Sequence, residues 1–550
     1  MTRRSVSKRF LLSALLLAAW GTPGVSYAAE YTDLVDAADD FDDLDEDTFD
    51  PFDFHLEPTF TFKYGTAQIT REAPCVGSVE DGESALVRNN PRLEVDPGRC
   101  SEPTTIYNKE MEYVGTRSQI DLKLRAGLFK DLELHFNVPY VFVNSRRLSY
   151  DDSSSDPTQN VSDLNSSVDP RVTCNPADSG RCVKREAEQV FSPTDTRQQQ
   201  IDKLDRFSAY RLFDLDSANE KEYLRSGFAE PSVGLHWSVF NDQRDPTKAN
   251  LLLGFDYVMP IVPIADQGNS AVGRGMHEFQ FKIASSKKFG WIEPYFGLEY
   301  FLPVARDDSP LRANLDPNND GQVFTNPPMR GEVTFGTEFI PYENAELGQR
   351  YGIDMRFTFG YVSEGRDYSP VYDHFAGSRC NDKTMSDVLP KFGTNGELSN
   401  PDDVACAWIL REPANTQGEG RNFYDLGAVV DDDDIFNNTE FSKNGIMTVE
   451  SYGTFRGMLA FYLQPAKNFQ LKAVGQLEHQ QEHFLTNART GRDADDANEE
   501  TNDITVDLEG ADSEIERNPV YNPTVDSSGE RLRVQNFNTW IVMVTAALQF

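Results

Sequence analysis

Residues 534–550, the last seventeen of the chain, alternate between two kinds of side chain. Because side chains alternate faces along a strand, this pattern predicts a β-strand with one apolar face and one face of mixed polarity. Such a strand suits a soluble sandwich or an outer-membrane barrel, in which lipid-facing and lumen-facing residues alternate. Counted back from the carboxyl terminus, the apolar face is Phe550, Leu548, Ala546, Val544, Val542 and Trp540.

The amino terminus favours the barrel. Residues 1–28 are organised like a secretory signal, with a basic start, an apolar stretch at 10–20 and a small-x-Ala ending at Ala28. This stretch of about 11 residues is short for a spanning helix, although a retained anchor is the alternative. We find no other run long and apolar enough to span. Since lipid tolerates only helices and closed barrels, a membrane form of this exported chain must be a barrel.

An acidic segment follows at residues 29–56. It holds twelve Asp and Glu residues and no Lys or Arg, and charge repulsion of this kind opposes compaction. We therefore expect a mostly disordered periplasmic tail. The formal net charge of the whole chain is −37, which argues against nucleic acid as a partner.

Twelve segments show strand alternation, and each is long enough for a tilted membrane strand. We expect an all-β, antiparallel transmembrane barrel of about 12 strands at residues 57–550. The connections alternate between short periplasmic turns and long extracellular loops, as in barrels but not in soluble sandwiches. The predicted strands are 57–70, 113–127, 131–143, 228–240, 249–262, 276–287, 291–303, 330–340, 351–363, 448–463, 469–484 and 534–550. The largest predicted loops are 71–112, 144–227, 304–329, 364–447 and 485–533.

All six cysteines fall in the predicted outer loops, two to a loop. An oxidising envelope permits disulfides, and bridges within loops would restrain segments too polar to pack a core. Metal ligation is the alternative, but the spacings are not C-x-x-C and no histidine accompanies them. The expected pairs are Cys75 with Cys100, Cys174 with Cys182, and Cys380 with Cys406.

Three segments resemble a known family in the same order along the chain. They are RAGLFKDLELHFNVPYVF at 125–142, GFAEPSVGLHWSVF at 227–240 and GRGMHEFQFKIASSKKFG at 273–290. Together they resemble outer-membrane proteins of the MetA-pathway phenol-degradation, or transporter-like, family over roughly strands two to seven. The resemblance implies an outer-membrane channel for small organic compounds, aromatic ones among them.

Placing the apolar faces outward turns two arcs of charge toward the lumen. Strands three to eight contribute an acidic arc, and the other strands a basic one, so that a transverse field would filter solutes by charge and size. The alternative is a network of paired charges that fills a narrow barrel. The acidic arc is Glu133, Glu230, Asp256, Glu278, Glu293, Glu299, Glu332 and Glu338, and the basic arc is Lys63, Arg117, Lys123, Arg125, Arg356, Arg456 and Lys472.

Motifs for catalysis and metal binding are scarce. There is no G-x-S-x-G, phosphate loop or H-E-x-x-H, so we expect no enzyme and no cofactor. Asp316, Asn318 and Asp320 begin like a calcium loop, but Pro327 takes the place of its final acidic ligand, which leaves only a weak metal candidate. His479 and His483, four apart in one predicted strand, form a conceivable metal pair or a solvated strand end.

The sequence thus favours an outer-membrane protein of a Gram-negative bacterium. Its first functional interpretation is a channel for passive passage of small polar or amphipathic solutes. The second is a structural or surface-display barrel that anchors large loops without transport. The expected partners are membrane lipid, small solutes and the barrel-assembly machinery, which would bind the carboxy-terminal Phe550.

The loop-restraint hypothesis makes a direct prediction about the cysteines. Non-reducing peptide mapping of the purified protein should recover three bridges, each within one predicted loop. A bridge between two loops, or free thiols throughout, would contradict the hypothesis.

Overall fold

The computed structural model describes most of the predicted strands and the start of several loops. The described residues are 54–76, 94–95, 104–129, 131–150, 172–175, 181–184, 191–196, 199–200, 222–242, 245, 247–266, 269–312, 326–344, 347–376, 389–400, 404, 445–466, 468–486 and 531–549. The predicted signal, the acidic tail up to residue 53 and Phe550 lie outside this set.

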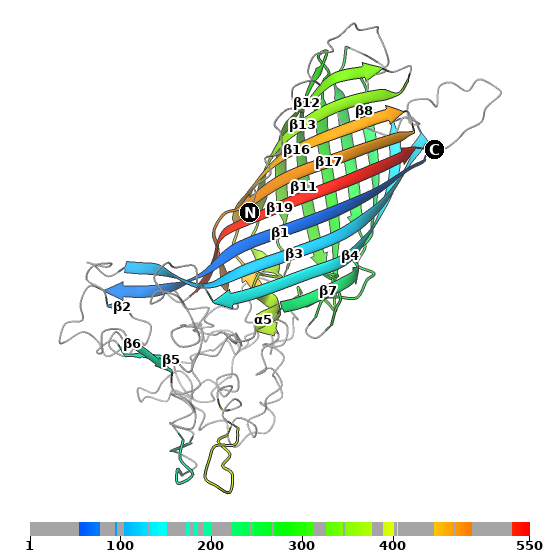
Figure 1. Ribbon diagram of the computed structural model, residues 1–550. Coiled ribbons are helices and arrows are strands. Elements are labelled where there is room, and N and C mark those ends of the chain that lie inside the picture. The colour runs from blue at the N-terminus through cyan, green and yellow to red at the C-terminus, as the bar shows by residue number, and fades with distance from the viewer. Residues whose placement is uncertain are drawn as a thin grey trace, which may run out of the picture.

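Twelve antiparallel strands form a closed ring (Figure 1). Each pairs with its neighbour along the chain, and the first, β1, pairs with the last, β19, from His55↔Gln549 to Arg71↔Leu532. This confirms the predicted all-β barrel, since every predicted strand has a counterpart in the ring. In order these are β1 (Phe54–Val76), β3 (Thr104–Phe129), β4 (Leu132–Tyr150), β7 (Glu222–Phe228) continued by β8 (Ser232–Phe240), β9 (Asn250–Val258), β10 (Met276–Ser286), β11 (Ile292–Ala305), β12 (Arg330–Asn344), β13 (Gln349–Val362), β16 (Tyr452–Ala466), β17 (Phe469–Gln480) and β19 (Leu532–Gln549).

Shorter elements lie at one end of the ring. Three short strands, β14 (Gly365–Asp367), β15 (Met447–Val449) and β18 (His483–Thr486), continue the wall there. The same end holds β2 (Glu94–Val95), the separate hairpin of β5 (Val172–Asn175) and β6 (Arg181–Lys184), and the helix α5 (Tyr372–Ala376). We call this the loop end, and the opposite end, where short connections join β3 to β4 and β10 to β11, the turn end.

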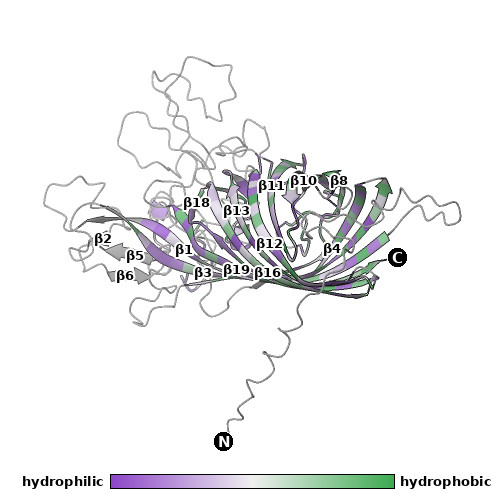
Figure 2. Cartoon of the chain, turned by 90° about the horizontal axis from the view of Figure 1, so that it is seen from above, coloured by the Kyte–Doolittle hydropathy of each residue, from purple (hydrophilic) through white to green (hydrophobic). Residues whose placement is uncertain are grey.

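The two faces of the wall differ in polarity, as the alternating bands along the strands show (Figure 2). On β19 the apolar set of the sequence pattern points outward, and Trp540 and Val542 are 60% and 52% exposed. Phe60, Leu122 and Phe357 on other strands are exposed in the same way. Apolar side chains left outside a closed barrel are stable only in lipid, because exposed apolar area of this extent is unfavourable in water.

Several strands extend beyond their predicted bounds. β1 begins at Phe54, inside the predicted tail, and β1, β3 and β4 continue at the loop end into segments predicted as loops. Polar side chains dominate these extensions, so hydropathy alternation fades there while backbone pairing continues. The fourth predicted strand is instead split into β7 and β8, because Pro231 between them lacks the N–H that a ladder requires.

No helix among the described residues is long and apolar enough to cross a membrane. The closed ring and its apolar exterior are the architecture of an outer-membrane protein. We therefore place the chain in the outer membrane of a Gram-negative bacterium.

Candidate functional site in the charged lumen

The lumen near the turn end contains a polar cavity of about 150 Å³. Cationic side chains reach it from three parts of the ring: Lys123 and Arg125 from β3, Lys282 from β10, and Lys472 from β17. Glu57 and His236 complete its charged and titratable lining. A cavity of this size and polarity holds water, so the interior is not filled by side chains throughout.

Arg125 connects the basic side of this cavity to the acidic side. Its Nε and Nη2 atoms donate to the two carboxylate oxygens of Glu133 at 2.9 and 2.7 Å, and its Nη1 donates to Glu57 at 3.0 Å. Glu133 is fully buried. A two-pronged arginine–carboxylate contact of this kind is strong and directional, and it stabilises a carboxylate that burial alone would disfavour.

A histidine pair lies beside Glu133. Nε2 of His135 is in hydrogen-bond contact with Asp256, and Nε2 of His236 lies 3.4 Å from the other oxygen of the same carboxylate. The two imidazole rings are 4.4 Å apart between centroids. Asp256 therefore orients both rings from one side.

A second charged network covers the opposite wall. Arg456 on β16 pairs with Glu332 at 3.2 Å and with Glu478 at 3.1 Å. Nearer the turn end, Arg350 pairs with Glu338 at 3.0 Å. Two carboxylates of the predicted acidic arc on β12 are thus paired with guanidinium groups: Glu338 with Arg350 of the adjacent strand β13, and Glu332 with Arg456 of β16, two strands away.

The side chain of Tyr295 on β11 extends over the neighbouring strand β12 at the position of a glycine. Its hydroxyl donates to Asp354 at 2.5 Å and accepts from Arg356 at 2.9 Å. The ring lies over Gly336, its cross-strand partner, where a Cβ atom would come within 2.1 Å of it. Only glycine permits this close approach, so Gly336 allows the Tyr295 side chain to extend to Asp354 and Arg356 on β13.

The remaining predicted lumen residues occupy varied settings. Lys63 and Arg117 are direct cross-strand partners, and Arg117 donates to Gln119 at 2.7 Å. Glu293 is fully buried and accepts from Ser286 at 2.7 Å. Lys282 and Glu299 are cross-strand partners in the β10–β11 register, and Glu278 accepts from Gln280 at 2.7 Å.

Glu230 differs from the other predicted lumen acids. It lies in the break between β7 and β8 and accepts from the backbone N–H groups of Arg274 and Gly275. This carboxylate therefore fixes the connection between β9 and β10 at the loop end. The placement follows from Pro231, which ends the regular alternation that the prediction assumed.

The chain between β14 and α5 crosses the lumen at the loop end, where α5 lies within the mouth (Figure 1). Val371 packs into an apolar cluster with Ile69, Met111 and Leu532 from the β1, β3 and β19 side. Its neighbour Tyr372 packs instead against Met276 and Ala305 of β10 and β11. One short segment thus contacts opposite walls, and we call residues 366–374 the mouth segment.

Ion pairs hold the mouth segment to the wall, and the carboxylate of Asp373 among them is buried. Arg225 of β7 donates to Asp373 at 2.5 Å, and Arg146 of β4 lies 3.7 Å from the same carboxylate. Arg274 donates to Asp367 at 2.7 Å. These three contacts attach the segment to strands or connections on one side of the ring.

Two phenols attach the mouth segment to the β9–β10 connection. The hydroxyl groups of Tyr368 and Tyr372 donate to the backbone carbonyl of Ala265 at 2.9 and 3.3 Å. Burial raises the pKa of both tyrosines above the ordinary value. Both therefore remain protonated donors at physiological pH.

The predicted cysteine and metal positions are only partly described. Cys174 and Cys182 are direct partners in the β5–β6 hairpin, which is the register that the proposed bridge needs, while Cys75 lies at the end of β1. Cys100, Cys380, Cys406, Asp316, Asn318 and Asp320 lie outside the described residues.

The conceivable pair of His479 and His483 is not assembled. His479 Nδ1 is 2.9 Å from the side-chain oxygen of Asn538, whereas His483 is buried and stacks on Tyr452. A break between β17 and β18 separates the two histidines, so the single strand assumed for them was wrong.

Sequence reasoning missed the two histidines and the mouth segment. The signal for the histidines was present, because Glu133 and His135 share one strand face and His236 lies on the inward face of β8. Asp373 had no such signal, since it belongs to a connection without alternation.

Comparisons with known proteins find structural neighbours only; no family model and no curated protein matches the sequence. An outer membrane channel of Pseudomonas putida F1 is 9% identical, with a TM-score of 0.28, over 90% of this chain and 95% of that one. The toluene transporter TodX of P. putida is 10% identical, with a TM-score of 0.26, over 92% and 91%.

The neighbours also include an enzyme. The outer membrane protease OmpT of Escherichia coli is 6% identical, with a TM-score of 0.25, over 92% of this chain and 98% of that one. The neighbours thus include channels and transporters as well as a protease. Scores this low carry no argument about function, so the absence of enzymatic activity stays a prediction.

The Arg125 network makes a prediction about stability. Arg125→Met should leave the buried Glu133 without its guanidinium partner and reduce the free energy of unfolding by about 3 kcal/mol. Urea unfolding in detergent, followed by tryptophan fluorescence, measures the change. Adding Glu133→Gln should recover part of the loss, while Lys248→Met at its exposed pair with Asp245 should leave the midpoint unchanged. An unaltered midpoint in Arg125→Met would show that the network contributes no stability.

Proposed function

We propose that this barrel is a gated outer-membrane channel for passive passage of small polar or amphipathic solutes, aromatic ones among them. The observation that carries the proposal is the polar cavity inside the barrel, lined by charged groups from β1, β3, β10 and β17. A barrel that served only as an anchor would have no need of a polar chamber at this depth. Charged groups on facing walls are the means by which pores select solutes.

The mouth segment supplies the gate. It is short and it contacts both walls. Its start in β14 pairs with β15, whereas from Tyr368 to His374 it is attached by side-chain contacts, among them the buried pair of Arg225 with Asp373. An element held by local contacts opens at a lower free-energy cost than the barrel wall. Passage past the loop end therefore requires the mouth segment to move.

The alternative function is a structural or surface-display barrel. The paired networks around Arg456 and Arg350 and the apolar cluster at Val371 are the features that favour it. The two functions differ in one measurable property, since only the channel conducts ions. Reconstitution into planar bilayers should give reproducible open steps, and their complete absence would support the structural role.

Ion selectivity tests whether the predicted basic arc lines the path. A unit charge about 8 Å from a permeating ion in water contributes about 0.5 kcal/mol. Arg117→Glu with Lys123→Glu should thus raise the cation-to-anion permeability ratio at least about twofold, measured as the reversal potential in a salt gradient.

The matched control for this pair carries the same change of charge outside the lumen. Lys248→Glu with Lys391→Glu, both at exposed positions, should leave the reversal potential at the wild-type value. A conducting Arg117→Glu/Lys123→Glu variant with unchanged reversal potential would show that these two residues do not line the path.

A further inference from the structure

Six inward positions on three adjacent strands form a compact pattern. Glu133 and His135 lie on β4, Gly234 and His236 on β8, and Gly254 and Asp256 on β9. In the register, Glu133 faces His236 and His135 faces Gly234. On the other side of β8, Gly234 faces Asp256 and His236 faces Gly254. Each histidine thus has a glycine as its neighbour across the strand.

The glycines provide the space in which the other side chains meet. A Cβ atom at Gly234 would lie 2.2 Å from Oδ1 of Asp256 and 2.5 Å from Nε2 of His135. At Gly254 it would lie 2.8 Å from the ring of His236. Any larger residue at position 234 would therefore separate His135 from Asp256.

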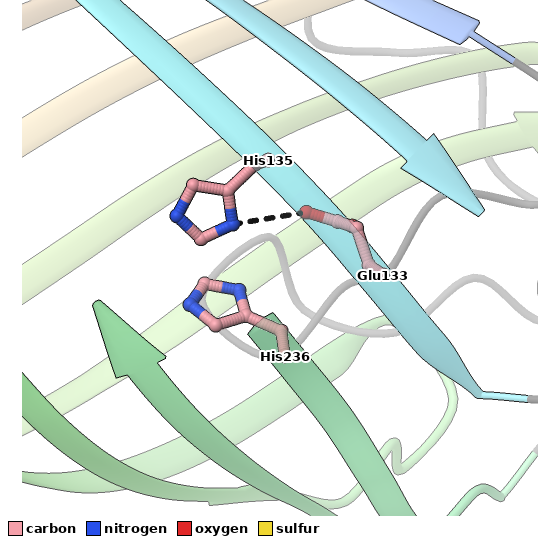
Figure 3. Close-up of side chains that lie close together, drawn as sticks. All are labelled: Glu133, His135 and His236. Atoms are coloured by element: carbon pink, nitrogen blue, oxygen red, sulfur yellow. Dashed lines mark ion pairs between the residues drawn. The ribbon is translucent and has the colours of Figure 1, made fainter. Parts of the chain in front are cut away.

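The imidazole nitrogens divide into two sets. The Nε2 atoms of both rings face Asp256, and the other ring nitrogens face the side on which Glu133 lies (Figure 3). Nδ1 of His135 is 3.7 Å from Oε1 of Glu133. One donor atom from each of Glu133, His135 and His236 can be chosen so that all three lie within 4.8 Å of one another.

One of these donor atoms lacks a hydrogen bond. His135 is only 4% exposed, and its Nδ1 atom is buried without a hydrogen-bond partner among the described residues. An unsatisfied buried nitrogen costs free energy, and here it points toward a carboxylate and a second imidazole. Coordination of a cation between the three groups would satisfy it.

The charges around the three groups are close to balanced. Glu57, Glu133 and Asp256 against Arg125 leave a net charge of −2, which the nearby Lys123 and Lys282 offset. Because Lys123 and Lys282 line the adjoining cavity, the electrostatic potential around the three groups is only weakly negative. Affinity must come from the imidazole donors, which favour zinc-like ions over calcium or magnesium.

We propose that Glu133, His135 and His236 bind one divalent transition-metal ion of the zinc class in the lumen near the turn end. Two histidines and one carboxylate are a zinc ligand set that leaves a coordination position open. Asp256 acts as the outer partner that orients both imidazoles, as carboxylates behind metal-bound histidines do. The site does not depend on whether the barrel conducts.

Zinc binding to the full-length, untagged barrel in detergent tests the proposal. After treatment with a chelator and exchange into zinc chloride, wild type should retain one tightly bound zinc, measured by elemental analysis and by competition with a chromogenic chelator. His135→Gln and His236→Gln should each weaken this binding at least about 100-fold. Glutamine suits the test because its amide can still reach Asp256 while offering no donor at the Nδ1 position.

Further variants separate ligands from neighbours. Asp256→Asn should weaken binding by about 10- to 100-fold, as loss of an orienting partner does. His479→Gln is the matched control, since His479 contacts Asn538 elsewhere on the wall, and it should bind zinc like wild type. Heat-modified migration on gels shows which variants remain folded barrels.

Cobalt gives a readout that does not depend on the variants being stable. Wild type loaded with Co²⁺ should show visible absorption bands, and excess zinc should remove them. The proposal is overturned if wild type binds no tight zinc and shows no cobalt bands. It is equally overturned if the folded His135→Gln and His236→Gln variants bind zinc like wild type, which would place the ion on acidic groups elsewhere.

Discussion

The hydrogen bonds between β1 and β19 join the two ends of the barrel sequence into one ring. Thr59 and Thr545, 486 positions apart, share a hydrogen bond between their hydroxyl groups at 2.9 Å. Without this seam both strands would present unpaired backbone groups, which lipid does not tolerate. Closure also fixes which face of every strand is inside. All charged side chains of the inward faces must then be accommodated in one confined lumen.

The surroundings of these inward-facing charges differ along the barrel axis. Near the turn end, charges surround a polar cavity, and Arg125, Asp256 and the histidine pair organise its acidic side. At mid-height, Arg456 bridges Glu332 and Glu478. At the loop end the lumen is filled by apolar side chains and by the mouth segment. The polar cavity and the mouth segment thus lie at different depths in the barrel.

Much of this architecture could be predicted from residue alternation. The outward set of β19, the inward Arg117, Lys123 and Arg125, and the order of the strands all follow from a period of two. The extents of the strands could not, because β1 and β3 continue past the bilayer where polar residues occupy both faces. Nor could the break at Pro231, which places Glu230 between β7 and β8 with its carboxylate bonded to the backbone of the β9–β10 connection.

The candidate sites could be predicted only in part for the same reason. The sign of the charge on each wall was predictable, but the ion pairs between side chains were not. Alternation shows which face of a strand a residue occupies, not its height in the lumen. His135 meets Asp256 across Gly234 only through the register of three strands. The mouth segment depends on contacts such as Arg225 with Asp373, which join positions 148 apart in sequence. Nothing in the local sequence of a connection predicts such contacts.

If a solute path runs through the lumen and the mouth segment closes it, weakening the attachment of that segment should open the channel. Single-channel recording of Asp373→Asn in planar bilayers measures this effect. The substitution removes the charge that Arg225 and Arg146 hold, while Arg225 keeps its bonds to the carbonyls of Asp266 and Asn269. We expect longer or larger openings than in wild type and in an Asp308→Asn control. A folded Asp373→Asn barrel whose openings match those of wild type would contradict it.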